Sequence, residues 1–295
     1  MERLSERTGY VAGGVNVGVI WLDERRVLMV DTGLSESNGK RVLKEIQRAG
    51  GEVVGILTTH AHADHFGANA AIVRRTGARV YAPPIDEAIL RHPELMPRML
   101  YAGADPPASM RGRFLLAESS PVDQVLPPGI TFIEGREINV VSLPGHSPGQ
   151  VGYRVDGVFF CADIVLPEDA IDKFKIPYIC SISEHLASLD TVAAVEYDVA
   201  MPGHGDVTAS LTELILLNRD LVTRLLDAIL KSLSEPRTMD DLMVDMLEAF
   251  EADPHEAAVY YLIQPTIYAA LSHLEQSGQV VNIIRDRRSA WVASC

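Results

Sequence analysis

The sequence predicts an α+β fold, with a mixed unit of strands and helices over residues 1–210 and a helical unit over residues 211–295. Two observations predict it. Several short apolar runs, such as Val53–Leu57, are bounded by turn residues, which is typical of buried strands. From Ser210 onward, apolar residues recur at helical spacing instead. A chain of 295 residues is long enough for a large core plus a second small unit.

The first 82 residues alternate between strands and helices. Two apolar runs flank the charged turn 23–26 and predict a pair of strands. The spacing of Val42, Leu43 and Ile46 predicts a helix that ends at Gly50-Gly51. The expected elements, in order, are strands at 15–22 and 27–30, a helix at 37–49, a strand at 53–57, a helix at 67–76 and a strand at 79–82.

Residues 83–128 contain nine of the 17 prolines of the chain. Proline at this density excludes long helices and central strands. We therefore expect a lid-like insertion with short helices near residues 85–91 and 95–101, placed over the mouth of a site. A substrate lid and a cover for the edge of the fold are equally consistent with this composition.

Strands resume after the insertion, and helices follow them. Asp156-Gly157 is typical of a hairpin turn. Thr238 is a helix cap, and Asp253-Pro254 and Pro265 indicate two further helix starts. The expected elements are strands at 130–134, 138–143, 150–155 and 158–161, a helix at 183–195, helices beginning near 211, 238, 253 and 266, and a hairpin of 280–284 with 290–293.

Three histidines and an aspartate are packed into the six residues His60-Ala61-His62-Ala63-Asp64-His65. They follow the apolar run 53–57 directly, which places them on the loop at the carboxyl end of a buried strand. Loops at this end of a sheet commonly hold functional groups. Because neutral imidazole and carboxylate are good ligands for zinc, iron or manganese, the cluster predicts a metal site.

This hexad resembles the signature of the metallo-β-lactamase fold superfamily. In that family, one His, a bridging Asp and a last His follow later strands, in this order. Here His146, Asp163 and His204 each end an apolar run, in the same order. The resemblance covers roughly residues 10–210. It implies a four-layer αββα sandwich, and the order of elements in residues 211–295 resembles the winged-helix-like tail of one branch of the family.

The resemblance also implies a binuclear site. His60, His62 and His146 would bind one divalent metal ion, Asp64, His65 and His204 would bind the other, and Asp163 would bridge the two. Asp31 would support the metal loop through hydrogen bonds, and Asp64 would also steer the attacking water. Zinc is the expected metal, with iron and manganese as alternatives. Two adjacent metal ions lower the pKa of a bridging water, which yields a hydroxide at neutral pH.

We therefore predict a metal-dependent hydrolase that uses a metal-bridging hydroxide on a small ester or thioester, as glyoxalase II-like enzymes do. The alternatives are an endoribonuclease or phosphodiesterase of the same fold, a lactonase, and a persulfide dioxygenase with a single iron. Leu166 disfavours a lactonase, because those relatives carry Tyr at this position. The complete set of ligand residues disfavours a non-catalytic protein on this scaffold.

A mixed basic and aromatic loop, residues 173–178, follows Asp163 in the chain. We expect it to lie near the metal ions. Lys173, Lys175 and Tyr178 are the candidates for contacts with an anionic or polar substrate. Solvated lysines and a packing tyrosine are the alternative interpretation.

Charge disfavours nucleic acid and anionic membranes as partners, because the formal net charge is −14. Over residues 218–295, seven Lys or Arg stand against twelve Asp or Glu. Residues 266–277, the candidate recognition helix, carry no Lys or Arg for phosphates or base edges. We expect the C-terminal unit to serve packing or homodimer formation, and the enzyme to act on a small molecule.

Two further features bear on localisation. No signal-peptide pattern follows Met1, and no apolar run approaches the length of a membrane span. Cys161, Cys180 and Cys295 form no CxxC pair, which is typical of a reducing compartment. These features predict a cytoplasmic protein.

Overall fold

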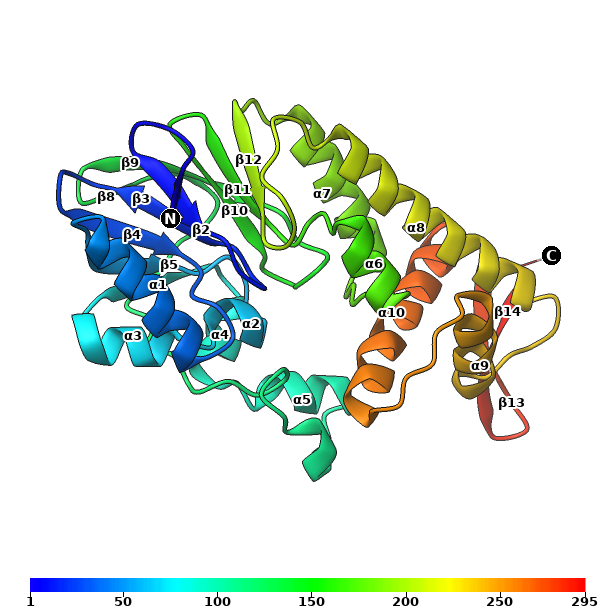
Figure 1. Cartoon of the computed structure of the whole chain (residues 1–295). Helices are drawn as coiled ribbons and strands as arrows, with labels where there is room; N and C mark the ends of the chain where they lie inside the picture. The colour runs from blue at the N-terminus through cyan, green and yellow to red at the C-terminus, as the bar shows by residue number, and fades with distance from the viewer. Residues whose placement is uncertain (295) are drawn as a thin grey trace.

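The computed structural model describes residues 1–294, so Cys295 lies outside the described residues. Two β-sheets face each other in the N-terminal part of the chain (Figure 1). The first sheet has seven strands in chain order: β1 (Glu2–Arg3), β2 (Thr8–Val11), β3 (Val17–Trp21), β4 (Arg26–Val30), β5 (Glu52–Leu57), β6 (Arg79–Ala82) and β7 (Gln124–Val125). The second has the order β12-β11-β10-β9-β8, with β8 (Gly129–Ile133), β9 (Arg136–Ser142), β10 (Val151–Val155), β11 (Val158–Ala162) and β12 (Val199–Pro202).

Helices cover the outer face of each sheet (Figure 1). The first sheet is covered by α1 (Glu36–Arg48) and α3 (Asn69–Thr76), and the second by α7 (Ile182–Ala194) and the start of α8 (Thr212–Ser232). Three apolar clusters fill the spaces between these four layers. Neighbouring side chains of a strand point to opposite faces, so Phe160 enters the central cluster and Phe159 the outer one. The predicted four-layer sandwich is confirmed.

The elements expected before residue 83 are present, with bounds within two residues of the predicted ones. One correction concerns the hexad. Only His60 to His62 lie on a loop, because Asp64 and His65 belong to a short helix, α2 (Ala63–Phe66). Their backbone groups form the first turn of this helix, and the His65 N–H donates to His62 O (2.9 Å). The carbonyl group of His65 accepts from Thr32 N (2.7 Å), so the end of the hexad lies against the segment after β4.

The insertion contains the two expected short helices, α4 (Asp86–Arg91) and α5 (Leu95–Leu100), followed by a 3₁₀ helix, η1 (Ala108–Met110). Its last part adds β7 to the first sheet, which the sequence did not indicate. Leu90, Leu100 and Met110 form one apolar cluster with Phe66 of the hexad helix. The insertion therefore packs directly against the loop that carries the histidines.

The C-terminal unit consists of α8, α9 (Met239–Ala249), α10 (Ala257–Gln276) and the hairpin of β13 (Val280–Arg285) with β14 (Arg288–Ala293). The cap at Thr238 is confirmed, because its side chain and that of Asp241 form a reciprocal capping box. An apolar cluster of α8, α9 and α10 also includes Ile176 and Ile179 of the preceding unit. The division at residue 210 and the winged-helix likeness stay predictions.

Two expected helix starts in this unit were wrong. Residues 253–256 are not helical, and one helix, α10, runs through Pro265. Proline removes one backbone hydrogen bond from a helix interior. Contacts on both sides of it hold the helix together: Tyr261 packs on Tyr101 (5.2 Å between ring centroids), and Thr266 Oγ1 donates to Pro177 O (3.0 Å). Tertiary packing thus overrides the local signal.

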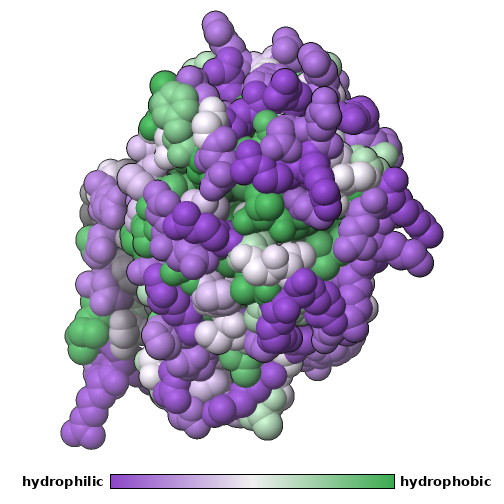
Figure 2. Space-filling model, turned by 90° about the vertical axis from the view of Figure 1, so that its left-hand side faces the viewer, coloured by the Kyte–Doolittle hydropathy of each residue, from purple (hydrophilic) through white to green (hydrophobic). Residues whose placement is uncertain are grey.

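The molecular surface is mainly hydrophilic on the side shown in Figure 2, with hydrophobic residues gathered mostly near its middle. Among residues 1–294, the structure contains no helix with the length and apolar character that crossing a membrane requires.

Candidate metal centre

The histidine loop is placed by β5, which pairs in parallel with β4 on one side and β6 on the other. Asp31 directly follows β4 and is buried beneath the loop. Its carboxylate accepts hydrogen bonds from Thr59 N (2.8 Å), Thr59 Oγ1 (2.7 Å) and His65 Nδ1 (2.8 Å). Asp31 therefore holds Thr59, which directly precedes the hexad, and His65, which ends it, whereas the role in metal binding that the resemblance implies for Asp31 stays a prediction.

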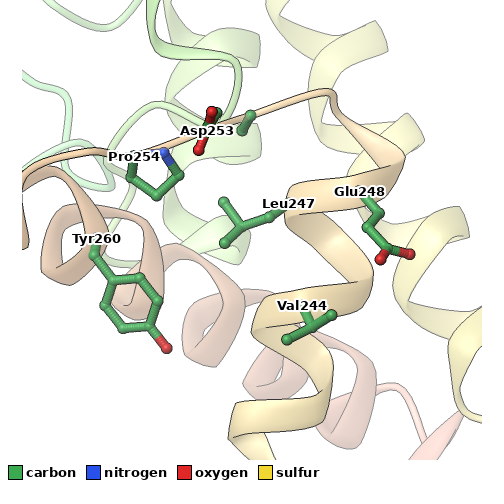
Figure 3. Close-up of a pocket in the computed structure, with 7 residues that line it drawn as sticks. Val244, Leu247, Glu248, Asp253, Pro254 and Tyr260 are labelled. Atoms are coloured by element: carbon green, nitrogen blue, oxygen red, sulfur yellow. The ribbon is translucent and has the colours of Figure 1, made fainter.

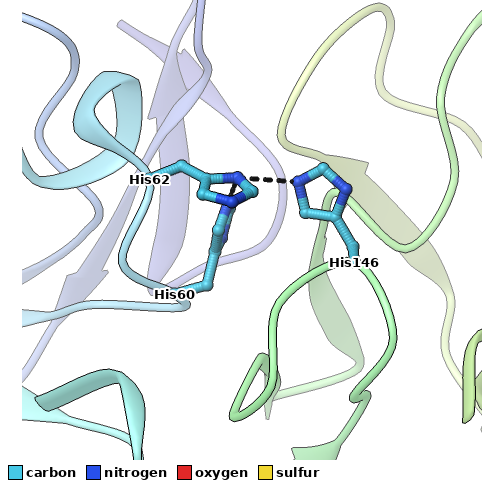
Figure 4. A group of neighbouring side chains, drawn as sticks. All are labelled: His60, His62 and His146. Atoms are coloured by element: carbon cyan, nitrogen blue, oxygen red, sulfur yellow. Dashed lines mark hydrogen bonds between the residues drawn. The ribbon is translucent and has the colours of Figure 1, made fainter. Parts of the chain in front are cut away.

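His60, His62 and His146 bring three ring nitrogens together (Figure 4). His62 Nδ1 lies 3.1 Å from His60 Nε2 and 2.9 Å from His146 Nε2. Burial, the largest effect, lowers the pKa of His62 to about 4 and that of His146 to about 3. Neutral rings direct lone pairs inward, so these nitrogens can hold a cation. We call these residues the first half-site.

Asp64, His65 and His204 form a second half-site next to the first. His204 Nε2 lies 3.5 Å from Asp64 Oδ2, and His65 Nε2 lies 4.0 Å from the same oxygen. Asp163 lies between the two half-sites. Its Oδ2 is 3.1 Å from His65 Nε2, 3.3 Å from His204 Nε2 and 3.6 Å from His146 Nε2. The structure thus brings together all seven predicted ligand residues.

The opposite ring nitrogen of four histidines is held by the protein. His65 Nδ1 donates to Asp31, His146 Nδ1 to Tyr178 O (3.0 Å), and His204 Nδ1 to Gly14 O (2.6 Å). His60 Nδ1 is 3.0 Å from Thr59 Oγ1, whose hydroxyl donates to Asp31. Such contacts fix the tautomer and orient Nε2 toward a metal ion, which is the usual arrangement for metal-binding histidines.

The electrostatics of the site fit a cation. Asp163 Oδ1 is buried and has no hydrogen-bond partner among the described residues. Although burial opposes it, His65 and His204 hold the pKa of Asp163 well below its ordinary value. Asp163 in turn raises the pKa of His204 to about 10. A buried carboxylate is stabilised by a nearby positive charge, and the first half-site provides neutral nitrogens with free lone pairs. The donor set therefore suits divalent metal ions.

The three candidate substrate residues lie in different surroundings. The ring of Tyr178 is 5.3 Å from the ring of His62, and burial raises the pKa of its hydroxyl. Lys175 follows α6 (Glu168–Phe174), its side chain is 39% exposed, and its Nζ lies 3.9 Å from Asp172. Lys173 lies within α6, with Nζ 4.9 Å from the centre of the Phe174 ring. Tyr178 is therefore the residue of this loop that borders the histidines.

Sequence reasoning missed the residues that place His204. The side chain of Asn16 donates to Pro202 O (3.1 Å) and Gly205 O (2.8 Å), and its backbone N–H donates to Gly203 O (2.8 Å). Asn16 is buried just before β3 and nearly 190 residues from its partners. Its position after the turn Gly13-Gly14 carried no local signal of this role.

Gly203 gives the first prediction. A Cβ at Gly203 would overlap Asp163 Oδ1 and lie 2.9 Å from His65 Cε1. Gly203→Ala should therefore displace Asp163. It should lower kcat/KM of the metal-loaded protein for hydrolysis of an ester or thioester by roughly 10- to 100-fold, as loss of a contact that supports a metal ligand does. Gly112→Ala is the matched control, because a Cβ there meets nothing within 4 Å. Equal activity of the two variants would contradict the prediction.

A separate shallow pocket lies between α9 and the start of α10 (Figure 3). Apolar side chains and two carboxylates line it, at Val244, Leu247, Glu248, Ala252, Asp253, Pro254 and Tyr260. None of these residues belongs to the histidine cluster. We therefore place the functional centre at the histidines.

Comparison with known proteins decides the family. The profile of the metallo-beta-lactamase superfamily matches residues 10–204, which include all seven clustered His and Asp residues. The chain belongs to the metallo-beta-lactamase superfamily. Two solved members of that fold align along almost the whole chain at 20% identity. They are a metallo-beta-lactamase family protein from Thermus thermophilus (TM-score 0.76; 99% of this chain and 100% of that one) and a beta-lactamase domain protein from Burkholderia ambifaria (TM-score 0.77; 100% and 94%).

A curated superfamily relative is the hydroxyacylglutathione hydrolase of Albidiferax ferrireducens. It is 32% identical over 184 residues, which are 60% of this chain and 57% of that protein. The chain therefore spans about half the length of the curated relatives that it matches. In two further hydroxyacylglutathione hydrolases, the alignment covers 41% and 54% of the relative. Superfamily membership and these names support the predicted enzyme class, a metal-dependent hydrolase.

Proposed function

We propose that this protein is a binuclear metal-dependent hydrolase of a small ester or thioester. The observation that carries the proposal is the position of Asp163 between two half-sites of three ligand residues each. The first half-site would hold one ion, the second the other, and Asp163 would contact both. Zinc is the expected metal, because imidazole and carboxylate suit it, and iron or manganese are the alternatives.

Divalent metal ions in these half-sites would polarise a carbonyl group and acidify water. The residues of the chain supply orientation and charge. Asp31, Thr59 and the carbonyl groups of Tyr178 and Gly14 hold the histidine rings in place. The side chain of Asp64 is 32% exposed, whereas that of Asp163 is 5% exposed. Asp64 is therefore the carboxylate that water or substrate can reach, and it can accept a hydrogen bond from the attacking water.

A small substrate is supported by the surroundings of the site. Tyr178 borders His62, and the apolar cluster of the insertion continues through Tyr178 to Tyr261 at the start of α10. Tyr178 and Tyr261 are only partly buried in this cluster, so an apolar part of a small substrate could contact them. The name of the Albidiferax ferrireducens relative makes a glutathione thioester the first substrate to test.

The packing of the C-terminal unit disfavours the nucleic-acid alternative. Ile267, Ala270 and Leu274 of α10 are buried against α8 and α9 in one cluster. A recognition helix needs an exposed face with Lys or Arg, and residues 266–277 offer none. We propose that this unit packs against the catalytic unit, and that homodimer formation is its second role.

The function is tested with zinc-loaded protein and its Asp163→Ala variant as the blank. The substrates compared are a glutathione thioester and a single-stranded RNA. We expect cleavage of the thioester by the wild type alone and no cleavage of the RNA. Cleavage of the RNA alone would overturn the small-substrate proposal and direct attention to Arg285, Arg287 and Arg288 of the hairpin. Cleavage of neither would overturn the thioester proposal.

A further inference from the structure

A buried carboxylate of the insertion, Asp86, lies next to the first half-site without being one of its ligands. It is fully buried at the start of α4. Its Oδ1 accepts hydrogen bonds from Ala61 N (2.7 Å) and Ser147 Oγ (2.8 Å), and its Oδ2 accepts one from Gly149 N (2.6 Å). Burial raises its pKa to about 6 although these three donors oppose the rise, and all three contacts use the carboxylate as an acceptor.

The three donors belong to the two loops that carry the first half-site. Ala61 lies between His60 and His62, and Ser147 follows His146 directly. These loops belong to different sheets, because one follows β5 and the other follows β9. Asp86 therefore ties together two loops whose strands are not hydrogen-bonded to each other.

The backbone around Asp86 is held in one strained position. Ile85 has φ 71° and ψ −58°, and Asp86 N donates to Pro84 O (2.9 Å). These values define a γ-turn of the rare and strained kind with positive φ, which is unfavourable above all for a β-branched residue. Such strain persists only where the surrounding structure fixes it, and it gathers at functional sites.

The loop after His146 also packs closely against Asp86. A Cβ at Gly149 would overlap Pro84 O and lie 2.6 Å from Asp86 Oδ2. The loop after His146 can approach Asp86 this closely because residue 149 has no side chain. Two independent features of the backbone, the γ-turn at Ile85 and the bare Gly149, thus serve one carboxylate.

We propose that Asp86 is a positioning residue that sets His60 and His62 against His146, and so controls metal binding at the first half-site. The inference rests on the proposed metal site. The second half-site has other supports: Asp31 holds His65, and Asn16 and the carbonyl group of Gly14 hold the loop of His204. Loss of Asp86 should therefore weaken one half-site and spare the other.

Co²⁺ affinity of the full chain, measured by visible absorption during titration, tests this asymmetry. His204→Ala isolates the first half-site, and His146→Ala isolates the second. Asp86→Ala should lower Co²⁺ affinity by roughly 10- to 100-fold in the His204→Ala background, the range expected for a contact that orients ligands. In the His146→Ala background the change should stay below about threefold.

Two companion variants sharpen the result. Asp86→Asn keeps one oxygen for Ala61 and Ser147, so its loss of affinity should be intermediate. Asp123→Ala is the matched control, because Asp123 also lies in the insertion and accepts from a backbone group, Val80 N (2.7 Å), away from both histidine loops. It should leave both affinities unchanged. If Asp86→Ala fails to fold, Ser147→Ala removes one of the three bonds and is judged by the same comparison.

The outcomes separate this inference from the proposed function. An equal loss in both backgrounds, or no loss in either, would overturn the positioning role of Asp86 while leaving the metal site in place. Wild-type protein that binds no Co²⁺ or Zn²⁺ would overturn the proposed function and this inference with it. A loss confined to the first half-site, graded from Asn to Ala at position 86, is the expected result.

Discussion

Replacing Asp163 by alanine is expected to lower kcat/KM for ester or thioester hydrolysis by far more than about 100-fold. Loss of a residue that only supports a metal ligand usually costs up to about 100-fold, and Asp163 is itself a proposed ligand. Asp163 lies within 3.6 Å of a histidine from each half-site, so its loss impairs both. The fold should persist, because His65 and His204 can release protons once the carboxylate is gone. Initial rates of zinc-loaded protein, together with circular dichroism spectra, check both expectations.

The control for this variant is Asp123→Ala, which removes a carboxylate that bonds Val80 N outside the site. It should keep wild-type kcat/KM. Full activity of Asp163→Ala would rule out the assigned site. Loss of activity together with loss of the folded spectrum would show a structural role for Asp163. His62→Ala would then test the site, because the side chain of His62 is only partly buried.

Metal removal should produce the second large effect, on stability as well as on activity. A ligand that binds only the folded state, at a free concentration about 1,000 times its Kd, stabilises that state by about 4 kcal/mol. For a chain of this size, roughly 2 °C of Tm accompanies each kcal/mol. Addition of Zn²⁺ to chelator-treated protein is therefore expected to raise Tm by roughly 8 °C and to restore hydrolysis.

Differential scanning calorimetry with and without Zn²⁺ measures this shift. His60→Ala should lose part of the increase, because it removes a ligand of the first half-site and leaves the second half-site, Asp64, His65 and His204, complete. Gly112→Ala should retain the full increase, since residue 112 touches nothing at its Cβ position. Hydrolysis that survives complete metal removal, with no change in Tm on adding Zn²⁺, would contradict a metal-dependent mechanism.

Most strands, most helices and the clustered residues of the hexad followed from the sequence because their signals are local, whereas β1, β2 and β7 were not expected. An apolar run that ends in a histidine or aspartate predicts a buried strand with a polar side chain at its end. The family resemblance pointed to His146, Asp163 and His204, each of which ends such a run. The turn residues Asp156-Gly157 predicted the hairpin that the structure contains. Their assignment as metal ligands stays a prediction, which the variants above test.

Local signals failed where distant contacts decided the outcome. Pro265 indicated a helix start, but the contacts of Tyr261 and Thr266 on either side keep α10 continuous. The end of the hexad was expected on a loop, but α2 forms there beneath the packed insertion.

The sequence by itself determined most strands and helices and the hexad, since periodicity and residue type can be read along the chain, and the family resemblance of the hexad implied the sandwich and the remaining residues of the functional centre. Only the tertiary structure decided how those residues are held. The carbonyl group that orients His204 belongs to Gly14, 190 positions away, and a carbonyl group is present at every residue. Asp86 likewise gains its role from Ala61 and Gly149, which carry no polar side chain. Every residue carries a backbone carbonyl group, and every residue except proline carries an N–H group. Residue type therefore does not indicate which backbone groups will bind a given side chain, and only the folded chain shows it.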